Sequence, residues 1–199
     1  MTASDPVYPP RADSLLLVPY AQVPRGTSVL EIGTGGGIAS LAAARCGARV
    51  VATDRNPYAL RRVRRVARAE NLDLETVRTD LARGLGRFDR ILANPPYLPT
   101  ATTERDPDRW HNLALDAGPD GTRTSERILD QLPEHLAPHA SAYLVGSSLQ
   151  TPAAVRRLLE RWRARGGLEE LVVSRRVEGE TLEVRRFSFP SATSREPQA

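Results

Sequence analysis

The sequence predicts an α/β fold built on a mainly parallel sheet, and two observations lead to this prediction. Short apolar runs of strand length alternate with longer segments of helical period over most of the 199 residues. A glycine-rich turn separates the first of these runs from the first helical segment, as in a strand–turn–helix unit. The length fits one domain, so we expect residues 1–189 to form a single domain and the polar segment 190–199 to be a disordered tail.

The elements follow one another in a regular order. An Ala-rich helix follows the glycine turn and is closed by Gly47, and Pro57 opens the next helix as its first residue. The segment 98–122 has no clear period, and we interpret it as a lid or substrate contact, with a disordered insertion as the alternative. The last two strands are expected to pair in antiparallel fashion around residues 178–179. The expected strands are 28–32, 49–53, 74–78, 88–93, 142–146, 168–175 and 181–189, and the expected helices are 38–46, 57–71, 125–136 and 152–165.

Composition excludes several classes of chemistry. All 28 basic side chains are arginine, so the chain can form no lysine Schiff base and no complete Walker A loop. With one cysteine, Cys46, it has neither an internal disulfide nor a multi-thiolate zinc site. The three histidines, His111, His135 and His139, show no metal-ligand spacing, so we expect no bound metal.

The N-terminal residues 1–6 lack a signal-peptide pattern, and no apolar run approaches the ~20 residues of a membrane span. We therefore expect a cytoplasmic protein. The net charge of +4 hints at an acidic partner such as RNA. However, the arginine clusters in 61–68 and 156–165 lie largely opposite apolar helix positions, which favours solvated outer faces.

The glycine-rich turn is the first candidate site. Gly33, Gly35 and Gly37, with Thr34 among them, follow a strand and let the backbone approach a ligand closely. The fingerprint of nicotinamide- and flavin-binding sites would place its third glycine at position 38, which is Ile38 here. Because Gly37 lies only one residue earlier, a nicotinamide or flavin site stays open as an alternative. Glu31 directly before the turn suits a ligand with a cationic end, such as S-adenosylmethionine, better than it suits a phosphate.

Acidic residues end the next two strands. Asp54 is placed to hydrogen bond ribose hydroxyls, although a helix cap for the segment opened by Pro57 is the competing interpretation. Asp80, followed by Leu81, ends the third strand at the same sheet edge, where it can accept a hydrogen bond from an adenine amino group or simply form a turn. These residues extend the predicted cofactor site.

The most specific motif is Asn94-Pro95-Pro96-Tyr97, directly after the fourth strand. A conjugated NH2 group is a poor nucleophile, and acceptors for both of its N–H groups can hold it in line with a methyl donor. The Asn94 side-chain oxygen and the Pro95 carbonyl supply two such acceptors. The prolines stiffen the loop, and Tyr97 offers a flat face to a planar substrate. A rigid surface turn is the competing interpretation.

Together, Glu31-Ile32-Gly33-Thr34-Gly35 and Asn94-Pro95-Pro96-Tyr97 resemble the HemK family of release-factor glutamine methyltransferases. The resemblance covers residues 7–189. The segment Val7-Tyr8-Pro9-Pro10-Arg11-Ala12-Asp13-Ser14 is similar to the opening of the short archaeal and eukaryotic branch, which lacks the N-terminal substrate domain of the longer bacterial enzymes. Ala12 stands where that branch usually has glutamate. The competing interpretation of this segment is that Asp13 or Ser14 caps a helix beginning at Leu15. Residues 115–121 are similar to the family's Gly-rich segment.

This resemblance implies a Rossmann-like class I methyltransferase fold, with a seven-stranded, mainly parallel sheet, a C-terminal antiparallel strand pair and helices on both faces. It implies methyl transfer from S-adenosylmethionine to the side-chain amide of glutamine in the Gly-Gly-Gln motif of a translation release factor. Tyr8 and Trp110 are expected to contact that substrate beside the four motif residues. Short relatives are often paired with a small zinc-binding activator subunit, which the sequence neither contains nor excludes.

Two other functions stay open at this stage. Methyltransferases that act on exocyclic amines of adenine or guanine in nucleic acids share the Asn-Pro-Pro-Tyr motif, and the positive charge is compatible with them. A cofactor-binding subunit that scaffolds another protein is the third hypothesis, against which the intact Asn94 argues.

Overall fold

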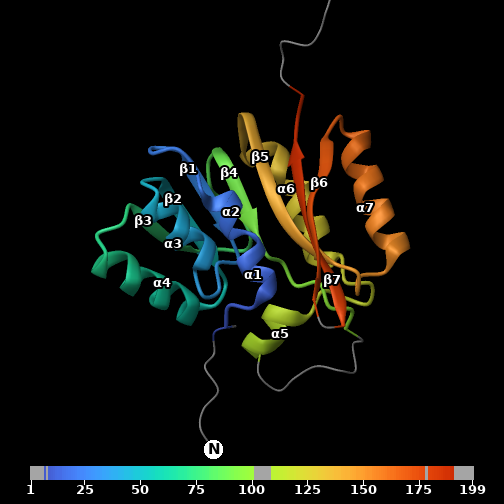
Figure 1. Ribbon diagram of the computed structural model, residues 1–199, viewed down its shortest axis with the longest axis horizontal. Helices are drawn as coiled ribbons and strands as arrows, with labels where there is room; N and C mark the ends of the chain where they lie inside the picture. The colour runs from blue at the N-terminus through green and yellow to red at the C-terminus, as the bar shows by residue number, and fades with distance from the viewer. Residues whose placement is uncertain (1–6, 8, 101–108, 178, 191–199) are drawn as a thin grey trace, which may run out of the picture.

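A twisted seven-stranded sheet forms the centre of the molecule, with helices packed on both of its faces (Figure 1). The computed structural model describes residues 7, 9–100, 109–177 and 179–190. The strand order is β3-β2-β1-β4-β5-β7-β6. The strands are β1 Ser28–Ile32, β2 Arg49–Asp54, β3 Leu74–Arg78, β4 Phe88–Ala93, β5 Leu136–Ser147, β6 Leu168–Val177 and β7 Glu180–Ser188. The helices are α1 Ala12–Leu16, α2 Val18–Ala21, α3 Ile38–Arg45, α4 Pro57–Ala69, α5 Arg109–Leu115, α6 Arg123–His135 and α7 Pro152–Ala164.

The first five strands of the chain pair in parallel, and β7 runs antiparallel to both of its neighbours, β5 and β6. The predicted fold class, the seven strands and the C-terminal antiparallel pair are thus confirmed. Because parallel strands share one direction, β1, β2, β3 and β4 deliver their carboxyl ends to the same edge of the sheet. The glycine turn, Asp54, Asp80 and the Asn94-Pro95-Pro96-Tyr97 motif lie at or directly after these ends.

Alternating residues of the central strands build two separate cores. Leu30 and Ile32 of β1 face the layer formed by α6 and α7, whereas Val29 faces α1, α2 and α3. This period of two is the expected consequence of a sheet that is covered on both faces. Trp162 of α7 is the largest fully buried side chain among the described residues, and its indole N–H donates to the Leu168 carbonyl at 2.9 Å.

Three local predictions differ from the structure. Helix α5 occupies part of the segment 98–122 for which no element was predicted, and residues 101–108 of that segment lie outside the described residues. Strand β5 begins at Leu136, six residues before the predicted start, because the polar first half of the strand still pairs with β4 from Phe88 onward. Helix α1 begins at Ala12 with Arg11 at its N-cap, so neither Asp13 nor Ser14 caps a helix from Leu15.

Gly47 follows the C-cap of α3 with a φ of +84°, which confirms its predicted role at that helix end. None of the described helices is long and apolar enough to cross a membrane.

Candidate active site

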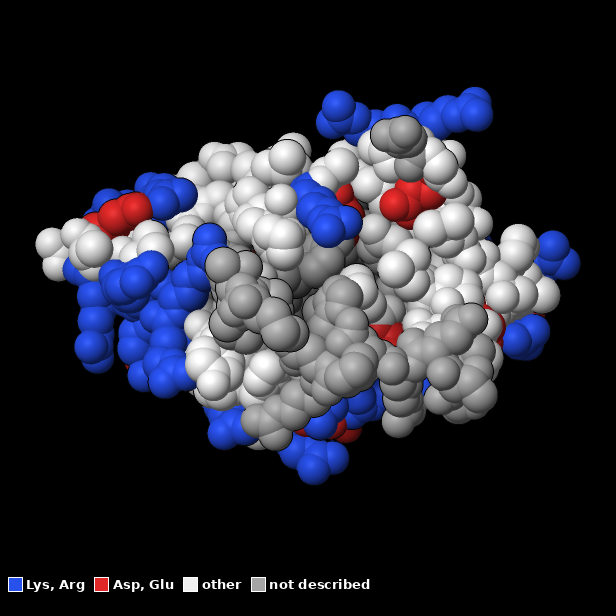
Figure 2. Space-filling view, turned by 90° about the horizontal axis from the view of Figure 1, so that it is seen from below, with Lys and Arg blue, Asp and Glu red and all other residues white. Residues whose placement is uncertain are grey.

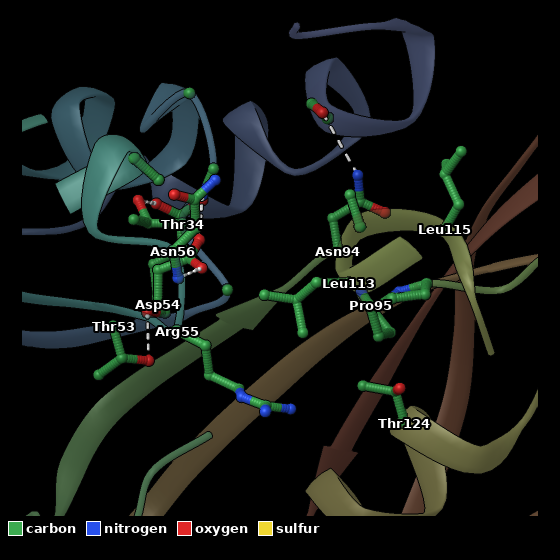
Figure 3. Close-up of a pocket in the computed structure, with 18 of the residues that line it drawn as sticks. Thr34, Thr53, Asp54, Arg55, Asn56, Asn94, Pro95, Leu113, Leu115 and Thr124 are labelled. Carbon is green, nitrogen blue, oxygen red and sulfur yellow. Dashed lines mark hydrogen bonds between the residues drawn. The ribbon is translucent and has the colours of Figure 1, made fainter. Parts of the chain in front are cut away.

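A pocket of about 700 Å³ lies at the carboxyl ends of β1, β2, β3 and β4. The glycine turn and the end of β2 form one side, and the loop after β4 forms the other, with Thr34 and Asp54 facing Asn94 and Pro95 across the space in Figure 3. Helix α1 and residues of α5 and α6 complete the wall. The pocket is therefore built from segments that are far apart in the sequence and meet only because the strands are parallel.

The glycine turn leaves room for a ligand at Gly33 and Gly35. Gly33 and Gly35 have φ values of +70° and +48°, and a Cβ on either would meet nothing within 4 Å. Gly37 differs, because its Cβ would lie 2.5 Å from Cγ2 of Val63, and it does not line the pocket. Gly33 and Gly35 thus leave the backbone open to a ligand, whereas Gly37 allows α3 to pack closely on α4.

Glu31, at the end of β1, stabilises the glycine turn through hydrogen bonds. Its Oε2 accepts hydrogen bonds from Thr34 Oγ1 at 2.6 Å and from the backbone N–H of Ser40 in α3 at 3.0 Å. The side chain is buried, and this burial raises the pKa of the carboxyl group although the two hydrogen bonds act in the opposite direction. A cationic group in the pocket would offset the cost of burying this charge.

Asp54 connects the end of β2 to the glycine turn. Its Oδ2 accepts from the Gly35 N–H at 2.9 Å, and its Oδ1 accepts from the Asn56 N–H at 2.8 Å. Burial raises the pKa of this carboxyl group as well. The alternative role as cap of α4 is wrong, because Asn56 is the N-cap and accepts from the Tyr58 N–H. Asp54 instead fixes the position of Gly35.

Asp80 lines the same pocket and has one carboxylate oxygen without a donor among the described residues. Its Oδ2 pairs with Arg127 of α6, whereas its Oδ1 is buried without a hydrogen-bond partner among the described residues. Leu81 adopts a left-handed φ of +59°, and Arg83 N–H donates to the Asp80 carbonyl, so Asp80 also begins a turn. A buried acceptor without a donor costs about 1–3 kcal/mol, which a ligand N–H would recover.

Asn94, on the opposite wall, also has an unpaired acceptor among the described residues. Its Nδ2 donates to Ser14 Oγ of α1 at 3.3 Å, and its Oδ1 is buried with no partner in the described part of the chain. Tyr97 donates its hydroxyl proton to Asp13 Oδ2 at 3.3 Å, and both motif prolines line the pocket. The loop after β4 is thus held by α1 at both ends of its motif.

The turn at residues 118–121 supports this loop from the other side. A Cβ on Gly121, whose φ is +78°, would lie 2.4 Å from the Tyr97 carbonyl oxygen. Gln150 is buried behind it, donates from Nε2 to the Gly121 carbonyl at 2.7 Å and accepts from the Ser147 N–H at 3.0 Å. The sequence analysis did not identify Gln150, because a single glutamine two residues before a helix that begins with proline matches no functional motif.

Most of the residues predicted for the site meet in this pocket. Trp110 lies on its wall and places its ring edge-on to Tyr58, with 6.2 Å between centroids. Leu113 also lines the pocket and was missed because α5 was not predicted. Arg127, which lies in the predicted helix α6, was missed because no motif surrounds it. Tyr8 lies outside the described residues, and Gly37 lies outside the pocket wall. The predicted residues that line it are Glu31, Gly33, Thr34, Gly35, Asp54, Asp80, Leu81, Asn94, Pro95, Pro96, Tyr97 and Trp110.

Comparisons with solved structures support the fold. The Encephalitozoon cuniculi Mtq2 chain, from a complex with Trm112 described as responsible for methylation of the termination factor eRF1, superposes with a TM-score of 0.71 at 23% identity, covering 93% of this chain and 99% of that one. The Thermus thermophilus 16S rRNA N2 G1207 methyltransferase RsmC, in complex with AdoMet and guanosine, superposes with a TM-score of 0.67 at 21% identity, covering 96% of this chain and 45% of that one.

Sequence comparisons identify the family. The model of the methyltransferase small domain matches residues 12–164. A Methanocaldococcus jannaschii protein named for N5-glutamine methyltransferase activity is 39% identical over 145 residues, which are 72% of this chain and 73% of that protein. Mouse methyltransferase HEMK2 is 30% identical over 195 residues, or 92% and 89% of the two chains. The Deinococcus radiodurans release factor glutamine methyltransferase is 40% identical over 122 residues, which are 58% of this chain and 44% of that enzyme. The protein therefore belongs to the methyltransferase small domain family, within its HemK group.

Proposed function

We propose that this protein transfers a methyl group from S-adenosylmethionine to the side-chain amide nitrogen of glutamine in the Gly-Gly-Gln motif of a translation release factor. The relatives named above act in this class of reaction according to their names. The observation that carries the proposal is Asn94, a residue of the pocket wall whose Oδ1 has no hydrogen-bond donor among the described residues. It supplies the acceptor that an amide N–H requires, and a carboxylate at this position would add a charge that a neutral amide does not need.

The cofactor is proposed to occupy the side of the pocket formed by the glycine turn, β2 and the loop after β3. S-adenosylmethionine, when bound, supplies a methyl group on a cationic sulfur. Glu31 is proposed to face its ammonium group, and Gly33, Thr34 and Gly35 to line its amino-acid portion. Asp54 is proposed to meet the ribose. The unpaired Asp80 Oδ1, followed by Leu81, is proposed to accept from the adenine amino group.

The substrate amide is proposed to enter beside the loop after β4. There Asn94 Oδ1 and the Pro95 carbonyl accept its two N–H groups and hold the nitrogen in line with the methyl group. The nitrogen forms its bond to the methyl carbon as the carbon–sulfur bond breaks, and one amide proton is released. Pro96 keeps the loop stiff, and Tyr97 and Trp110 supply flat surfaces to the peptide. Tyr8 remains a proposed substrate contact.

Transfer of a labelled methyl group from S-adenosylmethionine tests this function. Purified release factor, tRNA, rRNA and DNA are compared side by side, with a release factor whose motif glutamine is changed to alanine as the matched control. We expect label on the release factor alone and none on the control. Label on nucleic acid, with none on the factor, would refute the proposal.

A nucleic-acid substrate is the second candidate, and the surface of α4 favours it. Figure 2 shows arginine side chains gathered on the side of the molecule where α4 lies. Among the described residues, Arg65 and Arg68 of this helix pair with no carboxylate, and Arg64 bonds only to Thr76. By contrast, Arg157, Arg161 and Arg163 of α7 and its C-cap Arg165 are paired with acids of α6, β6 and the turn before α6. The same labelling experiment decides between the two substrates.

We also propose a small zinc-binding activator subunit as partner, because Mtq2 in the structure cited above is in complex with Trm112. Co-expression with such a subunit would raise solubility and turnover if it is required. A substrate that acts in translation places the proposed reaction in the cytoplasm.

A further inference from the structure

The amide of Asn94 has an orientation that needs an explanation. Its NH2 group faces Ser14, and its oxygen is buried without a donor among the described residues. The two ends of an asparagine amide have nearly the same shape. Rotation of the amide by half a turn would bring the oxygen to the Ser14 hydroxyl and the NH2 group to the position where the oxygen now lies, so one buried group would lack a partner in either orientation.

The neighbouring Asp13 explains why this rotation is unfavourable. Ser14 Oγ donates its only proton to Asp13 Oδ1 at 3.3 Å, and the Ser14 N–H donates to the same oxygen at 2.6 Å. A carboxylate has no proton to give, so it accepts this hydrogen bond and leaves Ser14 Oγ only its lone pairs to offer to Asn94. A rotated Asn94 would then place one acceptor against another.

The second carboxylate oxygen of Asp13 connects this hydrogen-bond network to Tyr97, the last residue of the Asn94-Pro95-Pro96-Tyr97 motif. Tyr97 donates its hydroxyl proton to Asp13 Oδ2 at 3.3 Å. Asp13 is only 4% exposed, so water competes little for these hydrogen bonds. The chain of donors therefore runs in one direction, with Tyr97 and Ser14 both donating to Asp13 and Asn94 donating to Ser14.

We propose that Asp13 and Ser14 are positioning residues that fix the amide of Asn94 so that its oxygen stays available to the substrate N–H. The proposal rests on the function given above for Asn94; both residues line the pocket beside Asn94, and the role proposed for them is exerted through its amide.

Steady-state kinetics test the positioning role. Ser14→Ala should lower kcat roughly tenfold, the effect of one net hydrogen bond, and leave the Kd for S-adenosylmethionine within about twofold of the wild-type value. Ser14→Thr keeps the hydroxyl and should restore most of kcat. Asp13→Ala removes the oxygen that accepts the Ser14 hydroxyl proton, so the hydroxyl can donate to a rotated Asn94 and kcat should fall as in Ser14→Ala. Leu15→Ala, at a 53% exposed residue of the same helix, is the control for loss of helix stability and should leave kcat unchanged.

A second measurement does not depend on the substrate. The chain has four asparagines, Asn56, Asn71, Asn94 and Asn112, so selective ¹⁵N labelling gives few side-chain amide signals. The Asn94 pair is assigned by its loss in Asn94→Ala. We expect Ser14→Ala and Asp13→Ala to shift the Asn94 signals and to speed their hydrogen exchange, and Ser14→Thr and Leu15→Ala to leave them in place.

The two measurements separate the two hypotheses. Absence of methyl transfer by the wild-type protein refutes the proposed function, and the amide signals then decide the positioning role on their own. Asn94 signals that stay unchanged in Ser14→Ala overturn the positioning role whatever the activity. Unchanged kcat in Ser14→Ala, with an active wild type, overturns it as well.

Discussion

Gly121→Ala should disturb the active-site loop from outside the pocket. The φ of +78° is unfavourable for any residue with a Cβ, at a cost of about 1–2 kcal/mol. The new Cβ would also lie 2.4 Å from the Tyr97 carbonyl oxygen, about 1 Å closer than van der Waals contact allows, and such overpacking costs about 1–3 kcal/mol more. Because Gln150 holds the Gly121 carbonyl at 2.7 Å, the strain is relieved mainly by moving the loop that carries Tyr97.

A displacement of this loop by about 1 Å is expected to lower kcat roughly a hundredfold. Gly166→Ala is the matched control, because Gly166 has the same φ of +78° and open space around its Cβ position. Thermal unfolding should place Gly121→Ala about 2–12 °C below Gly166→Ala, at about 2–4 °C per kcal/mol for a chain of this size. Equal melting temperatures, with wild-type turnover in both variants, would show that Gly121 does not support the loop.

Three further predictions concern the pH dependence of stability, the cofactor and the core. Burial raises the pKa of the Glu31 carboxyl group above its ordinary 4.5, so the folded state binds this proton more tightly than the unfolded state does. The free energy of unfolding therefore falls as the pH rises above 4.5. In denaturation at a series of pH values, Glu31→Gln should gain stability relative to wild type from pH 4.5 towards neutrality, and a constant difference between the two proteins would contradict this. Asp80→Ala should raise the Kd for S-adenosylmethionine, measured by calorimetry, about three- to tenfold. Arg127→Gln, which keeps the unpaired Asp80 oxygen, should raise the Kd less. Equal effects of the two variants would show that the ion pair, and not the unpaired oxygen, supports cofactor binding. Trp162→Phe removes the indole hydrogen bond to the Leu168 carbonyl in a fully buried site and should cost about 1–3 kcal/mol in urea denaturation without changing the Kd, and a neutral result would show that this bond contributes little.

The parallel strands and the order of the site segments could be predicted because their signals are local. An apolar run followed by glycine, acid or Asn-Pro marks a strand end, and parallel strands bring such ends to one edge. Asp54, Asp80 and Asn94 therefore line one pocket, as the sequence indicates.

The hydrogen-bond partners of these residues could not be predicted, because they depend on contacts distant in the sequence. Asn94 and Ser14 are 80 residues apart, and Asp54 bonds to the turn that Gly35 belongs to, 19 residues earlier. Glu31 was predicted to face a ligand, and its contacts with Thr34 and Ser40 add a structural role that no sequence pattern indicates. Helix α5 has no apolar period because it covers a pocket and not a core.

The most direct test of the proposed reaction is to locate the methyl group on the product by mass spectrometry. Release factor is incubated with S-adenosylmethionine and either wild-type protein or Asn94→Ala, and the peptide containing the Gly-Gly-Gln motif is fragmented. We predict one methyl group on the glutamine side-chain amide with the wild-type protein, and its loss with Asn94→Ala, which should still bind S-adenosylmethionine with nearly the wild-type Kd. A methyl group on another residue, or an Asn94→Ala variant that methylates the glutamine as fast as wild type, would contradict the role assigned to Asn94.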